Sequence, residues 1–245
     1  MKKYDYDNLA SDEHVFHMWE PLDFEIDDEY KYIKNDFLFK FVSKIVLFII
    51  RPILVFLNKV LFGYKIVNKD KIVSKMGVVS ISNHIHPMDC TMIGLIYFSY
   101  NVYYPTIERN FKIPFIKHLI RILGAFPIPS DKDKKKEFFC EVNMALKSNE
   151  HVHMYPEGSM WPYYTGIREF KYGAFKMAVD ADSFVQPIRF VFEESKGLVR
   201  LFRKKNISAV ILDPLYPNKE LNYYDRIEDL RNRTYKAMKE VLWKF

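Results

Sequence analysis

The chain has 245 residues, and its 49% hydrophobic content is enough for one sizeable core without requiring a second globular unit. The formal net charge is +6, but residues 1–35 hold four lysines against ten acidic residues (−6), so the remaining chain carries +12. A basic body suggests an anionic partner such as nucleic acid, a phosphate-bearing substrate or an acidic lipid surface. Two cysteines exclude a disulfide framework, and the first residues lack the pattern of a cleaved signal, so we expect a cytosol-facing protein.

Residues 36–62 form the first predicted element, after the acidic N-terminal extension 1–35. The stretch is almost all apolar, but basic residues divide it into uncharged runs too short to span a bilayer. At about 100° per residue, one narrow side of a helix would carry Lys40, Lys44, Arg51 and Asn58. This pattern predicts an interfacial helix with its cations on lipid phosphates, bent into two helices at Pro52. The alternative is a core helix of a soluble domain whose basic stripe faces water.

The rest of the chain, residues 63–245, alternates strand and helix patterns. Apolar, β-branched runs occur near 77–82, 101–106, 122–128, 151–155, 184–190 and 207–213. Helical patterns lie near 88–98, 110–121, 131–148 and 170–181, and a closing amphipathic helix near 222–244. Alternation at this spacing predicts a single layered α/β domain with a mostly parallel central sheet.

The segment NHIHPMD, residues 83–89, follows the first of these strands and has the composition of a catalytic loop. Pro87 is a natural first helical residue, which puts Asp89 in the first turn and leaves His84 on the loop. If Asp89 accepts a proton from one ring nitrogen, the other nitrogen can take a proton from a substrate hydroxyl. Each residue also has an ordinary explanation when taken singly: Asp89 can be an acid favoured by the helix dipole, and His84 can be a hydrogen-bonded loop histidine.

A second segment, YPEGS at residues 155–159, follows another predicted strand. Glu157 and Ser159 flank Gly158, a flexible position where backbone donors and an acid could orient an acceptor molecule. As an isolated string it also fits an ordinary turn from strand to loop.

Together these segments resemble the glycerolipid acyltransferase family, which includes 1-acylglycerol-3-phosphate acyltransferases. The resemblance spans roughly residues 61–190 and includes LGAFPI at 123–128 and FKYGAFK at 170–176. It implies that His84 is the general base, that Asp89 orients it and that Asn83 supports the loop. It also implies that the acceptor is held by Glu157, Gly158, Ser159 and Lys171.

The resemblance further implies direct attack of a lysophospholipid hydroxyl on an acyl-CoA or acyl-carrier-protein thioester, with no metal or other cofactor. The expected location is the cytosolic face of a membrane, peripheral or monotopic. The leading acceptor is 1-acylglycerol 3-phosphate, with other lysophospholipids or a non-phosphate hydroxyl as alternatives. Two places where the family commonly has arginine read Ser130 and Met160, although charge could come from nearby Arg121, Lys132, Arg168 or Lys171.

Two readings from other classes compete with an acyltransferase. His84 and His86 with His151 and His153 make two His-x-His pairs that could in principle form the metal site of a hydrolase. A non-catalytic membrane-surface protein would use the basic helix and the 17% aromatic content alone. Nucleic-acid binding is less attractive because no recognition motif accompanies the basic residues.

Overall fold

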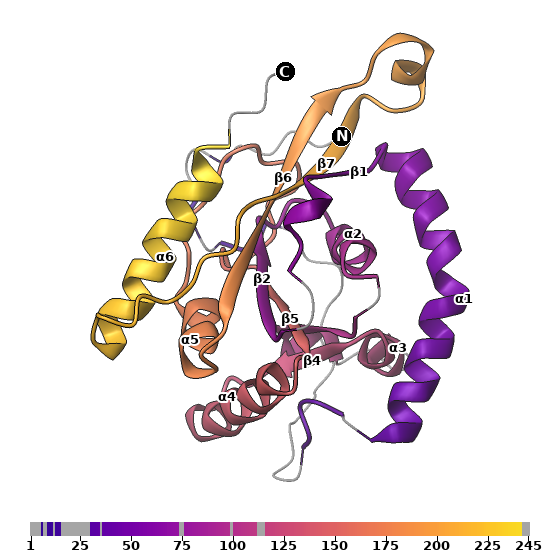
Figure 1. Cartoon of the computed structure of the whole chain (residues 1–245). Coiled ribbons are helices and arrows are strands. Elements are labelled where there is room, and N and C mark those ends of the chain that lie inside the picture. The colour runs from indigo at the N-terminus through magenta and orange to yellow at the C-terminus, as the bar shows by residue number, and fades with distance from the viewer. Residues whose placement is uncertain are drawn as a thin grey trace.

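A computed structural model describes residues 6, 9–11, 13–15, 30–34, 36–73, 76–98, 100–111 and 116–241. Its centre is a seven-stranded sheet of order β1-β7-β6-β2-β5-β3-β4 (Figure 1). The strands are β1 Lys65–Val67, β2 Val78–Ser82, β3 Val102–Ile107, β4 Ala125–Ile128, β5 His151–Met154, β6 Phe184–Glu194 and β7 Lys205–Ile211. Every neighbouring pair is parallel except β6 and β7, so the predicted α/β fold with a mostly parallel sheet is confirmed.

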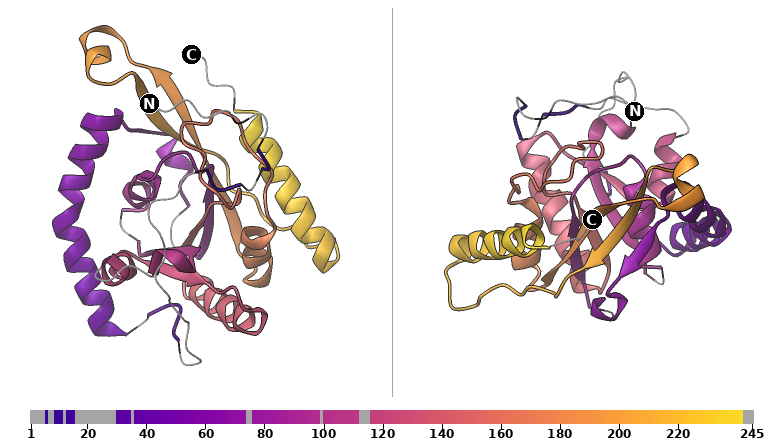
Figure 2. Two further views of the ribbon diagram at one scale, coloured as in Figure 1. Left: turned by 180° about the vertical axis from the view of Figure 1, so that it is seen from behind. Right: turned by 90° about the horizontal axis from the view of Figure 1, so that it is seen from above.

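Helices cover both faces of this sheet (Figures 1 and 2). They are α1 Phe37–Phe62, α2 Asp89–Ile96, α3 Ile116–Ile122, α4 Lys132–Lys147, α5 Gly173–Asp180 and α6 Tyr223–Lys239, with short 3-10 turns η1 Lys69–Lys71, η2 Glu108–Phe111 and η3 Gly197–Leu201. Parallel strands buried on both faces need such cover. The predicted strands and helices are found within a few residues of their expected bounds, except that the helix expected at 110–121 begins at Ile116. Strand β1 was not predicted, because its three residues are too few for a periodic pattern.

The alternation of side chains along the strands divides the core into two clusters. Val79 and Ile81 of β2 pack with α4, α5 and α6, together with Tyr32 and Ile33 from the end of the acidic extension. The other cluster joins α2 to the far side of β6 and to the C-terminal end of α1. The described residues 30–34 therefore pack against the domain.

Helix α1 is one continuous helix, which corrects the prediction of two helices joined at Pro52. Proline removes a single backbone donor, and the hydrogen bonds of the neighbouring turns hold the helix together. Asp36 caps its N-terminus by accepting from the Phe39 amide at 2.8 Å, and Gly63, at a φ of 54°, closes its C-terminus.

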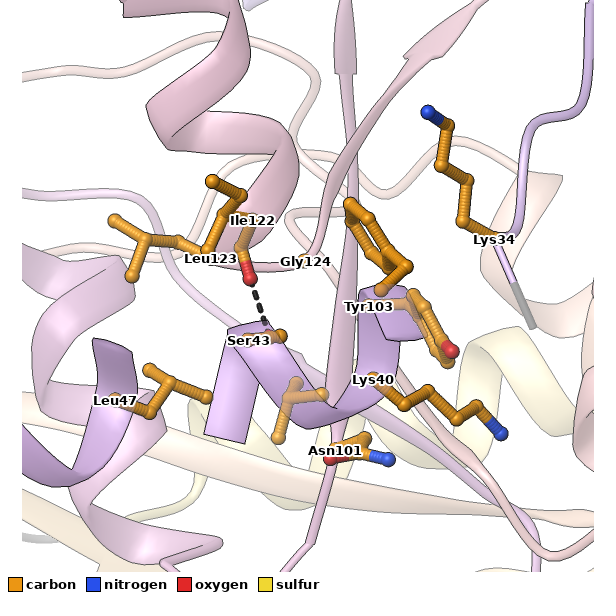
Figure 3. A pocket seen from close by; sticks show the side chains of 11 residues that line it. Lys34, Lys40, Ser43, Leu47, Asn101, Tyr103, Ile122, Leu123 and Gly124 are labelled. Atoms are coloured by element: carbon orange, nitrogen blue, oxygen red, sulfur yellow. Dashed lines mark hydrogen bonds between the residues drawn. The ribbon is translucent and has the colours of Figure 1, made fainter. Parts of the chain in front are cut away.

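The polar stripe of α1 faces the protein body except at Lys44, which is exposed; this orientation is opposite to the predicted one. Lys40 pairs with Glu150 at 2.8 Å, and Asn58 donates to Thr91 at 3.1 Å. The guanidinium of Arg51 lies over the Phe98 ring. Ser43, beside the stripe, donates to the Ile122 carbonyl in a pocket at the amino edge of the sheet (Figure 3).

The outward face of α1 is apolar. Its exposed side chains are Phe37, Leu38, Phe41, Val42, Ile45, Phe48, Ile49, Ile53, Val55, Phe56, Val60 and Leu61. A core helix would bury these groups, so the soluble-core alternative is wrong for this structure. By length and composition alone, α1 could also cross a membrane.

Candidate active site

Both sequence motifs lie at the carboxyl edge of the sheet. Strands β2 and β5 are parallel neighbours in register, with Ile81 opposite Met154. The loops that follow them, 83–88 and 155–159, therefore leave the same edge side by side. The 73-residue separation between His84 and Glu157 along the chain is closed by this one strand pairing.

His84 and Asp89 form the expected pair. His84 Nδ1 donates to Asp89 Oδ2 at 2.7 Å, and the same oxygen accepts from the Ile85 and His86 amides at 3.1 and 3.3 Å. The Asp89 side chain is 1% exposed, whereas that of His84 is 24% exposed. Among the described residues no group hydrogen-bonds His84 Nε2, so this nitrogen is left for an incoming proton.

Tyr155 contacts both members of the pair, which the sequence analysis did not foresee. Its hydroxyl donates to Asp89 Oδ1 at 2.8 Å. Its ring stacks on the His84 imidazole with centroids 3.9 Å apart and planes 14° apart. The sequence signal for this contact was the position of Tyr155 directly after β5, because β5 pairs with β2, the strand that precedes His84. The tyrosine fixes the plane of the imidazole and one oxygen of the carboxylate at once.

The charge state of Asp89 follows from these contacts. Burial by itself would raise the pKa of this carboxyl, but His84, Tyr155 and the His86 amide stabilise the anion and hold the pKa below its ordinary value. Asp89 is thus an anion that fixes the His84 tautomer with hydrogen on Nδ1, leaving Nε2 with its lone pair.

Glu157 and Ser159 hold the second loop together. The Glu157 carboxylate accepts from the His84 amide at 3.3 Å, the Arg168 amide at 3.0 Å and Arg168 Nη2 at 2.8 Å. Arg168 Nη1 donates to Ser159 Oγ at 2.6 Å, and Nη2 to the Ser159 carbonyl. All three residues are buried, so in this structure Glu157 supports the His84 loop from behind. Its predicted contact with the acceptor stays a prediction.

Gly158 and Lys171 lie together at the surface of this loop. Gly158 has a φ of 77°, which favours glycine, and a Cβ on it would lie 2.8 Å from Cε of the flexible Lys171 side chain, which would have to move. The Lys171 amide donates to the Pro156 carbonyl at 2.8 Å, and its side chain is exposed. This is the one predicted acceptor-binding side chain that lies at the surface.

Asn83 anchors the other loop to β6. Its side-chain amide donates to the Phe190 carbonyl at 3.1 Å and accepts from the Phe190 amide at 2.8 Å. His86 ties the same loop to α1, because its ring lies edge-on to Phe62 with centroids 4.6 Å apart. Burial lowers the pKa of His86, with Asp89 opposing the change. The His84 loop is thus held on two sides.

The two histidine pairs do not converge on a metal site. Ser80 and Ser82 hydroxyls lie 2.9 and 3.2 Å from the two ring nitrogens of His153, and burial lowers the pKa of this histidine to about 3. Its partner in the pair, His151, is buried between tyrosine rings. In the part of the chain that is described, no three metal-binding side chains come together.

Ser130 and Met160, at the two positions where the family commonly has arginine, lie in different environments. Ser130 is bound to the Glu108 carboxylate, with both contacts at 2.9 Å, whereas Met160 is buried. Arg168 is occupied by Glu157 and Ser159, and Arg121 binds the Tyr30 hydroxyl at 2.7 Å. Of the cations considered for an acceptor phosphate, the exposed ones are Lys132 and Lys171.

Parts of the acidic extension pack on the second loop. The Tyr6 ring stacks on Trp161 with centroids 4.9 Å apart, and Trp161 Nε1 donates to the Glu13 carbonyl at 2.9 Å. Arg168 Nη1 donates to the Ser11 carbonyl at 2.7 Å. Residues with no predicted role therefore brace the loop that supports His84.

Comparisons with known proteins identify the family and support the fold. The model of the Acyltransferase family matches residues 63–191. Among solved structures, the chain is similar to PlsC, the 1-acyl-sn-glycerophosphate (LPA) acyltransferase from Thermotoga maritima, at a TM-score of 0.52 and 16% identity over 84% of this chain and 97% of that chain. At this identity the likeness shows the fold. No curated protein sequence matches the chain.

Proposed function

Since this chain belongs to the Acyltransferase family, we propose that it moves a fatty acyl group from an acyl-CoA or acyl-carrier-protein thioester to a lysophospholipid hydroxyl, with His84 as general base. The observation that carries the proposal is the 2.7 Å hydrogen bond between His84 Nδ1 and buried Asp89, with Nε2 on the exposed side. The acceptor that we favour is 1-acylglycerol 3-phosphate, because the structurally similar PlsC is named as a 1-acyl-sn-glycerophosphate acyltransferase.

The reaction follows from the geometry of the pair. The acceptor hydroxyl gives its proton to His84 Nε2 while its oxygen attacks the thioester carbonyl carbon. Asp89 stabilises the imidazolium that forms, as the acid does in serine hydrolases. When the carbon–sulfur bond breaks, the thiolate leaves and takes that proton, giving an acyl ester and a thiol. No covalent acyl-enzyme is needed, because the substrate itself supplies the nucleophile.

Acceptor recognition rests on the surface next to His84. The Lys171 side chain lies over the Gly158 turn, its backbone amide is bound to the Pro156 carbonyl, and its ammonium is suited to a phosphate monoester. Lys132 is the other exposed cation among those considered. The arginine that could have served, Arg168, neutralises Glu157 instead, so we expect weaker dependence on the phosphate than two arginines would impose.

The outward apolar face of α1 supports a membrane location for this chemistry. Donor and acceptor are amphiphiles, and moving an acyl chain into water costs about 0.8 kcal/mol per methylene. Phe62, the last residue of α1, contacts His86 in the His84 loop, so the helix that we place on the lipid ends beside the reacting groups. We place the protein on the cytosolic face of that membrane.

The test is acyl transfer by protein reconstituted in vesicles, from labelled acyl-CoA or acyl-carrier protein to a panel of lysophospholipids, glycerol 3-phosphate and neutral alcohols. His84→Ala should abolish product formation, while the matched variant His118→Ala, at an exposed position of α3, should keep the wild-type rate. Retained activity in His84→Ala would remove His84 from its role. No product from any donor and acceptor, with vesicle binding intact, would favour the non-catalytic membrane protein.

A further inference from the structure

The β6–β7 hairpin ends in a tip of exposed apolar side chains. Strand β6 runs for 11 residues, and the hairpin projects from the body of the domain (Figure 1). At the tip, Leu198, Leu201 and Phe202 are 80%, 79% and 91% exposed. Exposed groups of this size on a projecting tip lower the solubility of a protein unless something covers them.

Cations surround these apolar groups. Residues 195–205 contain five basic residues and no acidic one. Lys196, Arg200 and Lys204 are exposed. Long basic side chains around leucine and phenylalanine fit an anionic membrane surface, where the cations reach the headgroups and the apolar groups enter the acyl boundary. The charge pattern therefore selects an anionic lipid bilayer as the occupant.

The tip is joined to the end of α1. Arg203 Nη1 donates to the carbonyls of Lys59 and Val60, at 3.0 and 2.6 Å. The Lys59 carbonyl also accepts from the Gly63 amide at 3.1 Å, and both carbonyls lie in the last turn of α1, where a guanidinium is suited to the negative end of a helix. Figures 1 and 2 show the hairpin tip beside this end of α1. The apolar tip thus lies beside the end of the apolar face of α1, which includes Val60 and Leu61.

This combined surface lies at the edge of the sheet that carries the candidate active site. Strand β6 runs parallel to β2, so its C-terminal extension projects past the carboxyl edge where β2 ends and the His84 loop begins. The end of α1 reaches the same loop through the contact of Phe62 with His86. A bilayer that touches both elements would face the edge from which His84 is reached.

We propose that Leu198, Leu201 and Phe202 insert into the same anionic bilayer that α1 contacts. The hairpin is then a second membrane contact that, with α1, sets the tilt of the domain so that the His84 edge faces the lipid. The inference rests on the proposed membrane location of α1, but it concerns a different element, and the two can be tested apart.

The experiment places an environment-sensitive fluorophore at the tip. The full chain with Cys90→Ser and Cys140→Ser receives Leu201→Cys, and a control receives Met144→Cys, an exposed apolar position on α4. Both are labelled and mixed with phosphatidylcholine vesicles with or without phosphatidylglycerol, and sedimentation is measured in the same samples. We expect a blue shift at position 201 with phosphatidylglycerol vesicles, and none at 144.

The outcomes test hairpin insertion separately from the membrane contact of α1. Protein that sediments with vesicles while the probe at 201 stays aqueous would refute insertion of the hairpin and leave the α1 contact standing. Protein that does not sediment would refute both. A concentration-dependent blue shift without vesicles would show that the tip packs against a second copy, which also refutes the inference.

A second variant measures how much the tip contributes to membrane partitioning. Leu198→Ser, Leu201→Ser and Phe202→Ser together should lower partitioning into phosphatidylglycerol vesicles at least about tenfold, because three apolar side chains leave the lipid. The matched control replaces Met144 and Tyr224, which are exposed on other helices, and should partition as wild type does. Transfer to a soluble short-chain acceptor in detergent should be unchanged in the hairpin variant, which separates membrane contact from chemistry.

Discussion

His151 is a buried histidine whose removal should make the protein less sensitive to acid. It opens β5, its ring stacks on Tyr100 at 4.4 Å and meets Tyr97 edge-on at 4.9 Å, and neither ring nitrogen has a hydrogen-bond partner among the described residues. Burial lowers its pKa from 6.5 to about 4. His151→Phe keeps an aromatic ring between the two tyrosines and removes both unpaired nitrogens. It should stabilise the protein at pH 7 by up to about 2 kcal/mol.

The pH dependence follows from proton binding by the two states. Between pH 6.5 and about 4 the unfolded chain holds a proton on His151 that the folded protein lacks, so acidification favours unfolding. The contribution of the neutral His151 ring to the free energy of unfolding is complete above pH 6.5 and is lost as the pH falls toward 4. At pH 5, which is about one and a half units below 6.5, the loss in the free energy of unfolding is about 2 kcal/mol, because each unit corresponds to about 1.4 kcal/mol.

Urea unfolding of the detergent-solubilised protein at pH 7 and pH 5 measures this difference. The wild type should lose about 2 kcal/mol more of its free energy of unfolding than His151→Phe does between the two pH values. His153, whose pKa burial lowers to about 3, acts in both proteins and cancels in the comparison. The exposed-position control His118→Phe should lose as much as the wild type. Equal losses in wild type and His151→Phe would refute the reasoning.

Three further predictions concern the candidate active site. Asp89→Asn should lower kcat about 100-fold or more with little change in the acceptor KM, because the amide no longer enforces the His84 tautomer; a change confined to KM would contradict the orienting role. Tyr155→Phe keeps the stacked ring and removes one of the hydrogen bonds that stabilise the Asp89 anion, so the pKa of Asp89 should rise; carboxyl titration by NMR measures this, and an unchanged Asp89 pKa would argue against this coupling. Arg168→Met should destabilise the protein by about 3–5 kcal/mol, because Glu157 is left as a buried unpaired charge; adding Glu157→Gln should restore most of the loss in thermal unfolding, and a purely additive double variant would show that the pair is not coupled.

Local patterns were enough to predict the fold class and the contact between His84 and Asp89. The strand that precedes His84, the proline two residues before Asp89 and the five-residue separation of the two are all neighbours in the chain, so hydrophobic periodicity and helix-start chemistry constrain them directly. The family match over 63–191 and the observed mostly parallel sheet agree with that prediction.

Tertiary structure decided what each polar group faces. Tyr155 reads as part of a turn until strand pairing brings it against His84, and Arg168 reads as an available cation until it is buried on Glu157. The stripe through Lys40 and Asn58 could be recognised on a helical wheel, but its direction depends on Glu150 and Thr91, which lie far along the chain. Periodicity along a chain tells which residues share a face, whereas the partner of that face is set by non-local packing.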